Sequence, residues 1–463
     1  MTTLIAVLIP GLLGFLCITV LLRHDPSTRT LERLCLAFPL GMGIISMQMF
    51  VLGIFGVPLT LKFVMIPIGL EIMVLCVWIV KNHTRLVEAP AFELFREIGN
   101  AGSLLKRVSM IVLLSWLSLK LGSIFMETFL RPIFAWDSFA NWAGSAKVFY
   151  YTKGLLLDVP LEEFFGKGLL NRNTNYPPHN PLTQVWFALW IGQFDEVLVK
   201  LSTPVYFLCM VVYLYLVAAR ETTRFLSLAI MVIFLGSPLM CFHAIEVYSD
   251  VPLSALILLS LGSFLLGIRG RNVYWALTGI FSAEALFMKD EGMFFVLPLL
   301  FSGSLFLWHK RQEIDRPLRS FFLMMIPFAY IIPWFVFKFK HELGFGADYV
   351  TLNLTFRPDM IWRIFLLFAS FRNFNVFFVL FPVLLILAGR PTREFLHLFL
   401  PVVCYALFFV MLYSMTKFFS GELMFYTAVH RNTLTYYPAA CLLMVFLIKR
   451  FGYSKSHASK DQS

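Results

Sequence analysis

Apolar runs of about 16 to 23 residues recur along the whole chain, and each is long enough to cross a hydrocarbon layer of about 30 Å. Of the 463 residues, 59% are hydrophobic and only 14% are charged. A soluble protein carries about 25% charged residues. Because a backbone in lipid must satisfy its own hydrogen bonds, runs of this length form helices. The sequence therefore predicts an all-α polytopic membrane protein.

Basic residues in the short segments between these runs predict the orientation of the helices. Such residues favour the cytoplasmic side, which accounts for the net charge of +11 without nucleic acid as a partner. All clusters obey this rule if the short apolar piece 182–191 fails to cross, as a re-entrant or interfacial helix would. We then expect about thirteen transmembrane helices. The expected cytoplasmic clusters lie at 23–33, 81–107, 220–224, 269–271, 310–319, 390–393 and 449–455.

The chain is expected to divide into three parts. Residues 1–107 would form an N-terminal addition of three spans followed by a cytoplasmic amphipathic segment. Residues 108–450 would form the main transmembrane core, and residues 451–463 a disordered cytoplasmic tail. The seven cysteines lie in or beside apolar runs without metal-ligand spacing, so they predict neither a zinc site nor a disulfide framework.

One long polar loop, at about 130–180, interrupts the apolar pattern on the expected outer side. It begins near Trp136-Asp137-Ser138 and ends on Tyr176-Pro177-Pro178-His179. Lipid-buried protein has few places for polar groups, so this loop is a candidate active site, with short interfacial helices. The charge rule places five other polar segments on the same side. They are 243–250, 289–292, 338–363, 372–373 and 417–431.

This combination resembles the GT-C superfamily of integral-membrane glycosyltransferases, which use polyprenyl-phosphate-linked sugars. Its protein O-mannosyltransferases and lipid A aminoarabinose transferases share four features with this chain. These are an early aspartate in a first large outer loop, a Pro-Pro element closing that loop, an aspartate heading a later span, and a basic group before the last helix. The resemblance covers about 108–440 and implies a membrane glycosyltransferase with a GT-C-like core.

The resemblance implies that Asp137 is the catalytic base, which takes the proton from the acceptor hydroxyl in an inverting transfer. A glycosyl phosphate already has a good leaving group, so one carboxylate suffices where a glycosidase needs two. The alternative is that Asp137 caps a helix N-terminus. Metal-dependent relatives generally carry a paired acid nearby, whereas here Ser138 follows Asp137. Transfer without a metal or other cofactor is therefore favoured.

A lipid-linked phosphate needs cations near the membrane boundary, and four side chains on the outer side are candidates to bind it. Arg431 is the strongest, because a guanidinium can hold a phosphate with two hydrogen bonds. His430, Lys289 and Arg372 are the others. The alternative for Arg431 is a snorkelling anchor at a helix end, and Lys289 could belong to a plain interfacial turn.

Five further residues are candidates to bind the sugar or the acceptor: Tyr176, His179, Tyr248, Asp250 and Glu291. The prolines after Tyr176 direct the chain toward the membrane whatever the roles of Tyr176 and His179. The resemblance implies that Asp250 lies in the donor pocket. Alternatively it caps the span that Pro252 begins.

The expected partners are a polyprenyl-phosphate-linked sugar donor, membrane lipids, and a lipid, glycan or protein acceptor. We expect a bacterial inner membrane with the site facing the periplasm, or an endoplasmic reticulum membrane with a luminal site. Two other functions fit an outer polar site, namely a transporter or flippase of lipid-linked glycans and an O-antigen-type ligase or polymerase. A transporter usually shows internal repeats and polar groups at mid-membrane depth. The sequence shows no internal repeat.

Overall fold

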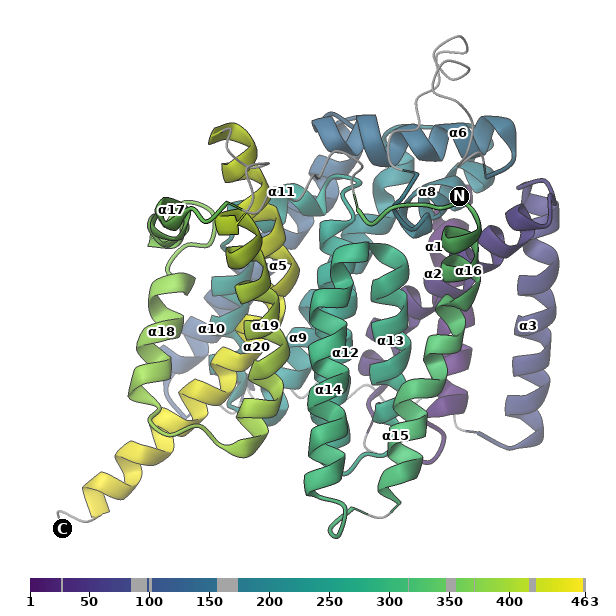
Figure 1. Ribbon diagram of the computed structural model, residues 1–463. Helices are drawn as coiled ribbons and strands as arrows, with labels where there is room; N and C mark the ends of the chain where they lie inside the picture. The colour runs from purple at the N-terminus through teal and green to yellow at the C-terminus, as the bar shows by residue number, and fades with distance from the viewer. Residues whose placement is uncertain are drawn as a thin grey trace.

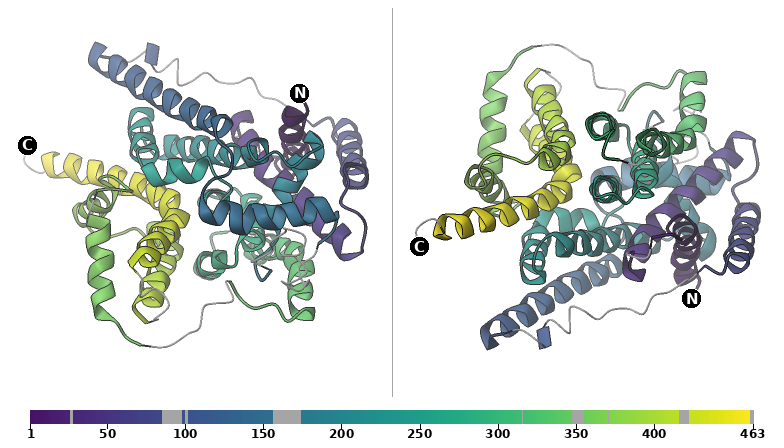
Figure 2. Two further views of the ribbon diagram at one scale, coloured as in Figure 1. Left: turned by 90° about the horizontal axis from the view of Figure 1, so that it is seen from above. Right: turned by 90° about the horizontal axis from the view of Figure 1, so that it is seen from below.

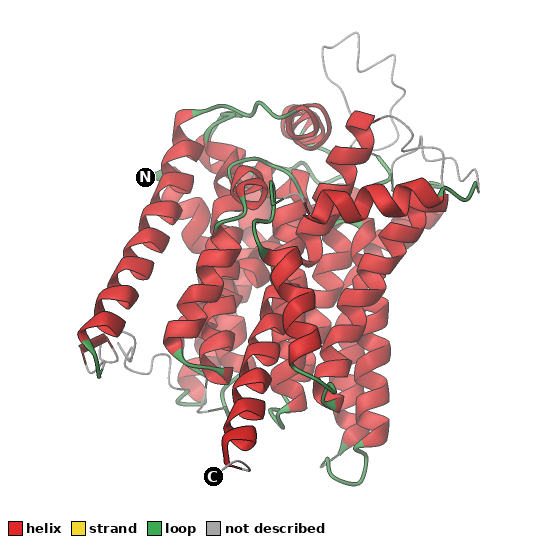
Figure 3. Cartoon of the chain, turned by 90° about the vertical axis from the view of Figure 1, so that its left-hand side faces the viewer, coloured by secondary structure: helices red, strands yellow, loops and turns green. Residues whose placement is uncertain are grey.

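The structure is a computed structural model that describes residues 1–25, 28–84, 98–99, 102–155, 174–314, 316–346, 355–369, 371–415 and 422–460. Within these ranges the chain forms helices and no strands (Figure 3). Most of the helices run side by side as a bundle, with the N-terminus at one end and the C-terminus at the other (Figure 1). The predicted all-α membrane fold is therefore confirmed.

In chain order the helices longer than six residues are α1 (Thr2–Leu21), α2 (Thr30–Ile54), α3 (Leu61–Lys81), α5 (Leu104–Leu130), α6 (Gly144–Thr152), α8 (His179–Ile191), α9 (Ser202–Glu221), α10 (Arg224–Leu235), α11 (Pro238–Ala244), α12 (Asp250–Ile268), α13 (Tyr274–Met288), α14 (Met293–His309), α15 (Pro317–Met325), α16 (Ile332–Lys340), α17 (Pro358–Ala369), α18 (Phe377–Leu387), α19 (Arg393–Met415) and α20 (Glu422–Lys460). Short 3-10 helices lie at Leu198–Leu201, Asp290–Gly292 and Ile326–Ile331, and a π-helix at Ser138–Ala143.

The number of membrane-crossing helices differs from the prediction. Among the described residues, ten helical segments are long and apolar enough to cross, or eleven if α10 and α11 form one broken span. These two meet at a bend of 76°, where Pro238 begins α11 and Ser237 Oγ accepts from the Met240 amide. The predicted count of about thirteen is not confirmed. Helices α13 and α18, with 15 and 11 residues, are shorter than a typical span.

The charged groups separate to the two ends of the bundle, as α12 and α13 show. Asp250 begins α12 and Arg269 follows its last residue. Arg271 precedes α13 and Lys289 follows it. At the basic end, Arg271 pairs with Asp25 at 2.7 Å. At the opposite end, Lys289 pairs with Asp250 at 3.2 Å. The prediction that the unusual polar segments share one end of the bundle is confirmed for these residues.

The N-terminal helices pack directly against the core. An added Cβ at Gly14 in α1 would lie 1.8 Å from the Ala37 carbonyl oxygen in α2, so glycine permits the close crossing. Ser46 and Glu32 of α2 contact side chains of α8 and α9. The segment 1–107, predicted as an addition, thus contributes to the packed interior. Most of its predicted amphipathic piece lies outside the described residues.

The outer loop builds a cap over one end of the bundle. The π-helix at 138–143 continues into α6, which lies across that end (Figure 1). Residues 156–173 of the loop lie outside the described residues. Short helices in this loop were predicted, and the π-helix and α6 confirm that expectation.

Helix α8 stays near the end of the bundle that carries the outer loop. Near its start, Asn180 donates to the Val247 carbonyl at 2.8 Å, and just beyond its end Glu196 pairs with Lys147 of α6 at 2.6 Å. The left-handed Gly192, with φ of 86°, ends the helix after only 13 residues. The structure therefore agrees with the expectation that segment 182–191 does not cross.

Helix α20 is longer than predicted. It reaches Lys460, whereas a disordered tail was expected from residue 451. Views from above and below show its C-terminal part extending away from the bundle, and α5 at the periphery (Figure 2). Residues 461–463 fall outside the described part, and the disordered tail stays a prediction.

Candidate active site

Asp137 lies between the end of α5 and the π-helix that begins at Ser138. Its side chain makes no capping hydrogen bond to that helix, so the alternative role as a helix cap is not supported. Instead, Asn141 Nδ2 donates to Asp137 Oδ1 at 3.2 Å, and Arg431 Nη1 donates to Asp137 Oδ2. The carboxylate retains 28% exposure, which leaves it accessible to a small group from outside.

Arg431 of α20 contacts two carboxylates at once. Besides Asp137, its Nε donates to Asp250 Oδ2 at 3.2 Å, and its guanidinium carbon lies 4.7 Å from the ring centre of Tyr248. The side chain is 22% exposed and Asp250 is fully buried. A guanidinium between two carboxylates and an aromatic face is fixed in position. Arg431 is therefore not a free snorkelling anchor.

Asp250 continues the same set of contacts toward the loop after α13. Its Oδ1 accepts from Lys289 Nζ at 3.2 Å, and Lys289 Nζ lies 3.3 Å from Glu291 Oε1. Tyr176 donates its hydroxyl to the same Glu291 oxygen at 2.9 Å. We call the series Asp137, Arg431, Asp250, Lys289, Glu291 and Tyr176 the ion-pair chain. It joins the outer loop, the start of α12, the turn after α13 and helix α20, which are far apart in the sequence.

The charge of Lys289 is stabilised by this arrangement. Burial favours the neutral amine, but the carboxylates of Asp250 and Glu291 outweigh it and raise the pKa of Lys289 above its ordinary value. Lys289 and Arg431 are thus two cations held about one buried carboxylate. Both cations are paired with carboxylates in the structure.

Of the ten predicted site residues, the structure brings seven together. They are the six members of the ion-pair chain and Tyr248, on which the Arg431 guanidinium lies.

His179 is not part of this group. Its Nδ1 lies 2.7 Å from Ser46 Oγ and its Nε2 lies 3.1 Å from the Tyr206 hydroxyl, so both ring nitrogens are occupied inside the bundle. Burial lowers the pKa of His179 to about 3, which keeps the ring neutral. In the structure His179 therefore packs between helices, and its predicted role in sugar binding stays a prediction.

His430 and Arg372 also lie apart from the ion-pair chain. The half-buried ring of His430 lies 6.0 Å from the ring of Phe374, and Arg372 is exposed. On the next residue, the carbonyl of Asn373 accepts from Ser237 at the start of α11. Neither side chain contacts a member of the ion-pair chain among the described residues, so the structure does not support their predicted phosphate contact.

His243 is a site residue that the sequence reasoning did not select. Its Nδ1 lies 3.5 Å from Asp250 Oδ2, and its ring stacks on Tyr248 with centres 4.3 Å apart. It precedes Asp250 by seven residues on α11, which the 76° bend brings back to the start of α12. The polar segment 243–250 was recognised, but the sequence holds no signal for this bend other than Ser237-Pro238.

The polar segment 338–363 is described only in part, because residues 347–354 lie outside the described ranges. Its first part contacts the site end. Lys338 Nζ lies 2.7 Å from Asp290 Oδ2, and the Gly346 amide donates to the same oxygen at 2.9 Å. The Gly344 amide donates to Asn175 Oδ1 at 3.0 Å. This segment thus connects the residues next to Glu291 with those next to Tyr176.

Comparisons with known proteins found similarity over part of the chain. Residues 176–337 match the family model described as dolichyl-phosphate-mannose-protein mannosyltransferase. Two solved structures of ArnT from Cupriavidus metallidurans resemble the chain, each with 14% identity over 72% of it. The apo form has a TM-score of 0.49 over 59% of the ArnT chain, and the form bound to undecaprenyl phosphate has 0.46 over 60%. The chain thus matches less than two thirds of the ArnT length. No curated protein matches the sequence.

The matched segment contains six members of the site: Tyr176, His243, Tyr248, Asp250, Lys289 and Glu291. It runs from the end of the outer loop through α16 and includes the crossing pair α12 and α13. This part of the chain, about a third of its length, is thus similar to the dolichyl-phosphate-mannose-protein mannosyltransferase family.

Proposed function

We propose that this protein transfers a sugar from a polyprenyl-phosphate donor to a hydroxyl group of a lipid, glycan or protein acceptor. The matched family is named for a donor of this class, a mannose carried on dolichyl phosphate. The observation that carries the proposal is the position of Arg431, which joins the carboxylates of Asp137 and Asp250 at one end of the spans. The phosphate of a lipid-linked donor lies at the membrane boundary, where transmembrane helices end.

Arg431 and Lys289 are proposed to bind the donor phosphate. Both cations are already paired in the structure, so the phosphate must compete with a carboxylate for one of them. Asp137 is the most exposed of the three acids, at 28% against 17% for Glu291 and none for Asp250. The phosphate would therefore displace Asp137 from Arg431, while buried Asp250 keeps both cations in place.

This exchange would prepare Asp137 for its role as general base. Once released, its carboxylate accepts the proton of the acceptor hydroxyl as the acceptor oxygen attacks the anomeric carbon. The bond from that carbon to the phosphate oxygen breaks, and its electrons leave with the polyprenyl phosphate. Arg431 and Lys289 stabilise the charge on that phosphate. A single displacement inverts the anomeric configuration.

We propose that the site faces the extracytoplasmic side, because the basic loops lie at the opposite end of the bundle. This corresponds to the periplasm for a bacterial inner membrane, or to the lumen for an endoplasmic reticulum membrane. The acceptor enters from the aqueous side and the donor from the lipid.

Transfer is proposed to proceed without a divalent metal. Both Asp137 and Asp250 bind Arg431, and no group of three His, Cys, Asp or Glu side chains in the described ranges is placed to hold an ion. We therefore expect EDTA to leave the initial rate of sugar transfer by the purified enzyme unchanged. A loss of activity that magnesium or manganese restores would contradict this expectation.

The decisive experiment replaces Asp137 with asparagine. Asp137→Asn keeps the size of the side chain but cannot accept the proton, so the transfer rate should fall by about 10²- to 10⁴-fold. The measurement is transfer of labelled sugar from a polyprenyl-phosphate donor by purified protein in lipid. Glu196→Gln is the matched control, since it removes an acid that is 41% exposed at the same end of the bundle.

If Asp137→Asn keeps the wild-type rate, Asp137 is not the base. If the wild-type protein transfers no sugar but moves a labelled lipid-linked glycan across vesicles, the flippase alternative holds instead. Transfer only from lipid pyrophosphate donors would favour the ligase or polymerase.

A further inference from the structure

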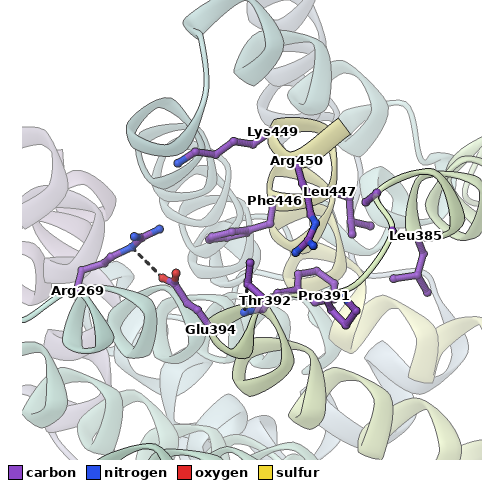
Figure 4. Close-up of a pocket in the computed structure, with 12 residues that line it drawn as sticks. Arg269, Leu385, Pro391, Thr392, Glu394, Phe446, Leu447, Lys449 and Arg450 are labelled. Carbon is purple, nitrogen blue, oxygen red and sulfur yellow. Dashed lines mark hydrogen bonds and ion pairs between the residues drawn. The ribbon is translucent and has the colours of Figure 1, made fainter. Parts of the chain in front are cut away.

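A cavity of about 500 Å³ lies at the basic end of the bundle (Figure 4). The ends of α12 and α18, the start of α19 and residues 446–450 of α20 surround it. Arg269 lines the cavity just after α12, whereas Asp250 begins that helix, so 19 residues of helix separate the cavity from the ion-pair chain. At 1.5 Å per residue this is about 28 Å. The cavity is therefore distinct from the proposed transfer site.

The walls of the cavity are mainly apolar and border the lipid. Leu385, Phe446 and Leu447 line it. Next to Leu385 on α18, Ile386 is 78% exposed, and Leu396 on α19 is also exposed. In a membrane protein such exposed apolar side chains face acyl chains. A hydrocarbon chain can therefore continue from the surrounding lipid into the cavity.

Three cations line the cavity, and two carboxylates neutralise them only in part. Arg269 lies 2.8 Å from Glu394 and 3.0 Å from Glu221, and Lys449 lies 3.1 Å from the same Glu221. Arg450 has no ion pair within the described part of the chain. Figure 4 shows its side chain reaching from α20 toward the start of α19. One positive charge thus remains without a partner next to an apolar cavity.

The surroundings add to this positive charge. Arg390 and Arg393 are exposed on both sides of the turn Pro391-Thr392, which forms part of the cavity wall. Basic pockets between transmembrane helices on the cytoplasmic side attract anionic lipid head groups. A zwitterionic lipid would bring a second cation next to its phosphate, and that cation would be repelled by Arg390, Arg393 and Arg450.

We propose that this cavity binds an anionic phospholipid of the cytoplasmic leaflet. Its phosphate binds the guanidinium of Arg450 and the ammonium of Lys449. One acyl chain lies along Phe446 and Leu385. The volume suits a phosphate head group with its glycerol and the first part of a chain.

Native mass spectrometry of the purified full-length protein, titrated with phosphatidylglycerol or phosphatidylcholine, tests this proposal. The wild-type protein should bind phosphatidylglycerol about tenfold more tightly, the gain expected for a hydrogen bond between charged groups. Arg450→Gln should reduce that affinity to the level of phosphatidylcholine. Arg311→Gln is the matched control, because it removes an exposed arginine at the same end but outside the cavity.

A second variant tests the cavity itself without changing charge. Ala388 lines the cavity and is 5% exposed, so Ala388→Phe should fill the space and also abolish the preference for phosphatidylglycerol. Equal binding of the two lipids by the wild type, or a wild-type preference in Arg450→Gln, would overturn the proposal. Displacement of phosphatidylglycerol by excess inorganic phosphate would show a site for free anions instead and would equally overturn it.

Discussion

At the scale of single residues, Arg431 determines the geometry of the site. It lies 294 residues from Asp137 and 181 residues from Asp250 in the sequence, and its guanidinium contacts both carboxylates. Removing one partner of a buried ion pair costs about 3–5 kcal/mol, because the remaining charge has no compensation. Asp250 is fully buried, so it depends on Arg431 and Lys289 to remain charged.

Replacing Arg431 with lysine separates its charge from its shape. Lysine keeps the positive charge but cannot contact Asp137 and Asp250 through separate nitrogens. Losing one hydrogen bond to a charged group, about 1.5–3 kcal/mol, should lower kcat/KM for the donor by about 10- to 150-fold. Steady-state transfer kinetics measure this. Arg131→Lys serves as control, since Arg131 is 57% exposed at the end of α5. A wild-type kcat/KM in Arg431→Lys would show that charge alone is needed.

At the scale of elements, α8 is held in place by polar contacts. His179 connects it to Ser46 of α2 and Tyr206 of α9, and Trp186 donates to the Ala6 carbonyl of α1 at 2.8 Å. Because both ends of α8 remain at the site end, α9 begins there and crosses to the basic end. The short helix α8 therefore determines in which direction α9, and each span after it, crosses the membrane.

The neutral state of His179 predicts a pH dependence of stability. Its pKa in the folded protein is about 3, against an ordinary value of 6.5, so below pH 6.5 the unfolded chain binds a proton that the folded protein does not. Stability should fall by up to about 1.4 kcal/mol per pH unit from 6.5 toward 3. His179→Gln should be less stable at pH 7 but lack this loss, with its transfer rate per folded molecule unchanged.

Thermal unfolding in detergent between pH 7 and pH 4.5 measures this effect. His309→Gln is the control, because His309 is exposed at the basic end. A parallel decline of wild type and His179→Gln would contradict the packing role. A variant of normal stability with greatly reduced transfer would instead support the predicted role in sugar binding.

At the scale of the whole molecule, the separation of charges to two ends predicts the orientation in the membrane. Lys153, at the end of α6, and Gln312, between α14 and α15, are both exposed and lie at opposite ends of the bundle. In a variant without the exposed Cys76, Lys153→Cys should react with a membrane-impermeant thiol reagent on intact cells. Gln312→Cys should react only after permeabilisation. The reverse pattern would place the site in the cytoplasm.

The apolar runs predicted the helical class, and the charge pattern predicted the shared end of Asp137, Asp250, Lys289 and Arg431, because transmembrane helices obey simple rules of length and charge. It did not predict pairwise contacts. The inward position of His179 depends on Ser46, 133 residues earlier, and the contact of His243 depends on the bend at Ser237-Pro238. Such contacts depend on packing between segments that are distant in the sequence. A local sequence pattern gives no information on that packing.

Asp290 gives the site end one further property. One of its oxygens accepts from both Lys338 and Gly346, while Asn175 contacts Lys338 through its carbonyl and Gly344 through its side chain. The segment 338–346 therefore acts as a clasp across two others, one leading to Tyr176 and one to Glu291. An acceptor too large for the closed clasp must break several of these bonds together, so entry would be all-or-none. The rate of clasp opening would then limit transfer to large acceptors but not to small ones, independently of the chemistry at Asp137.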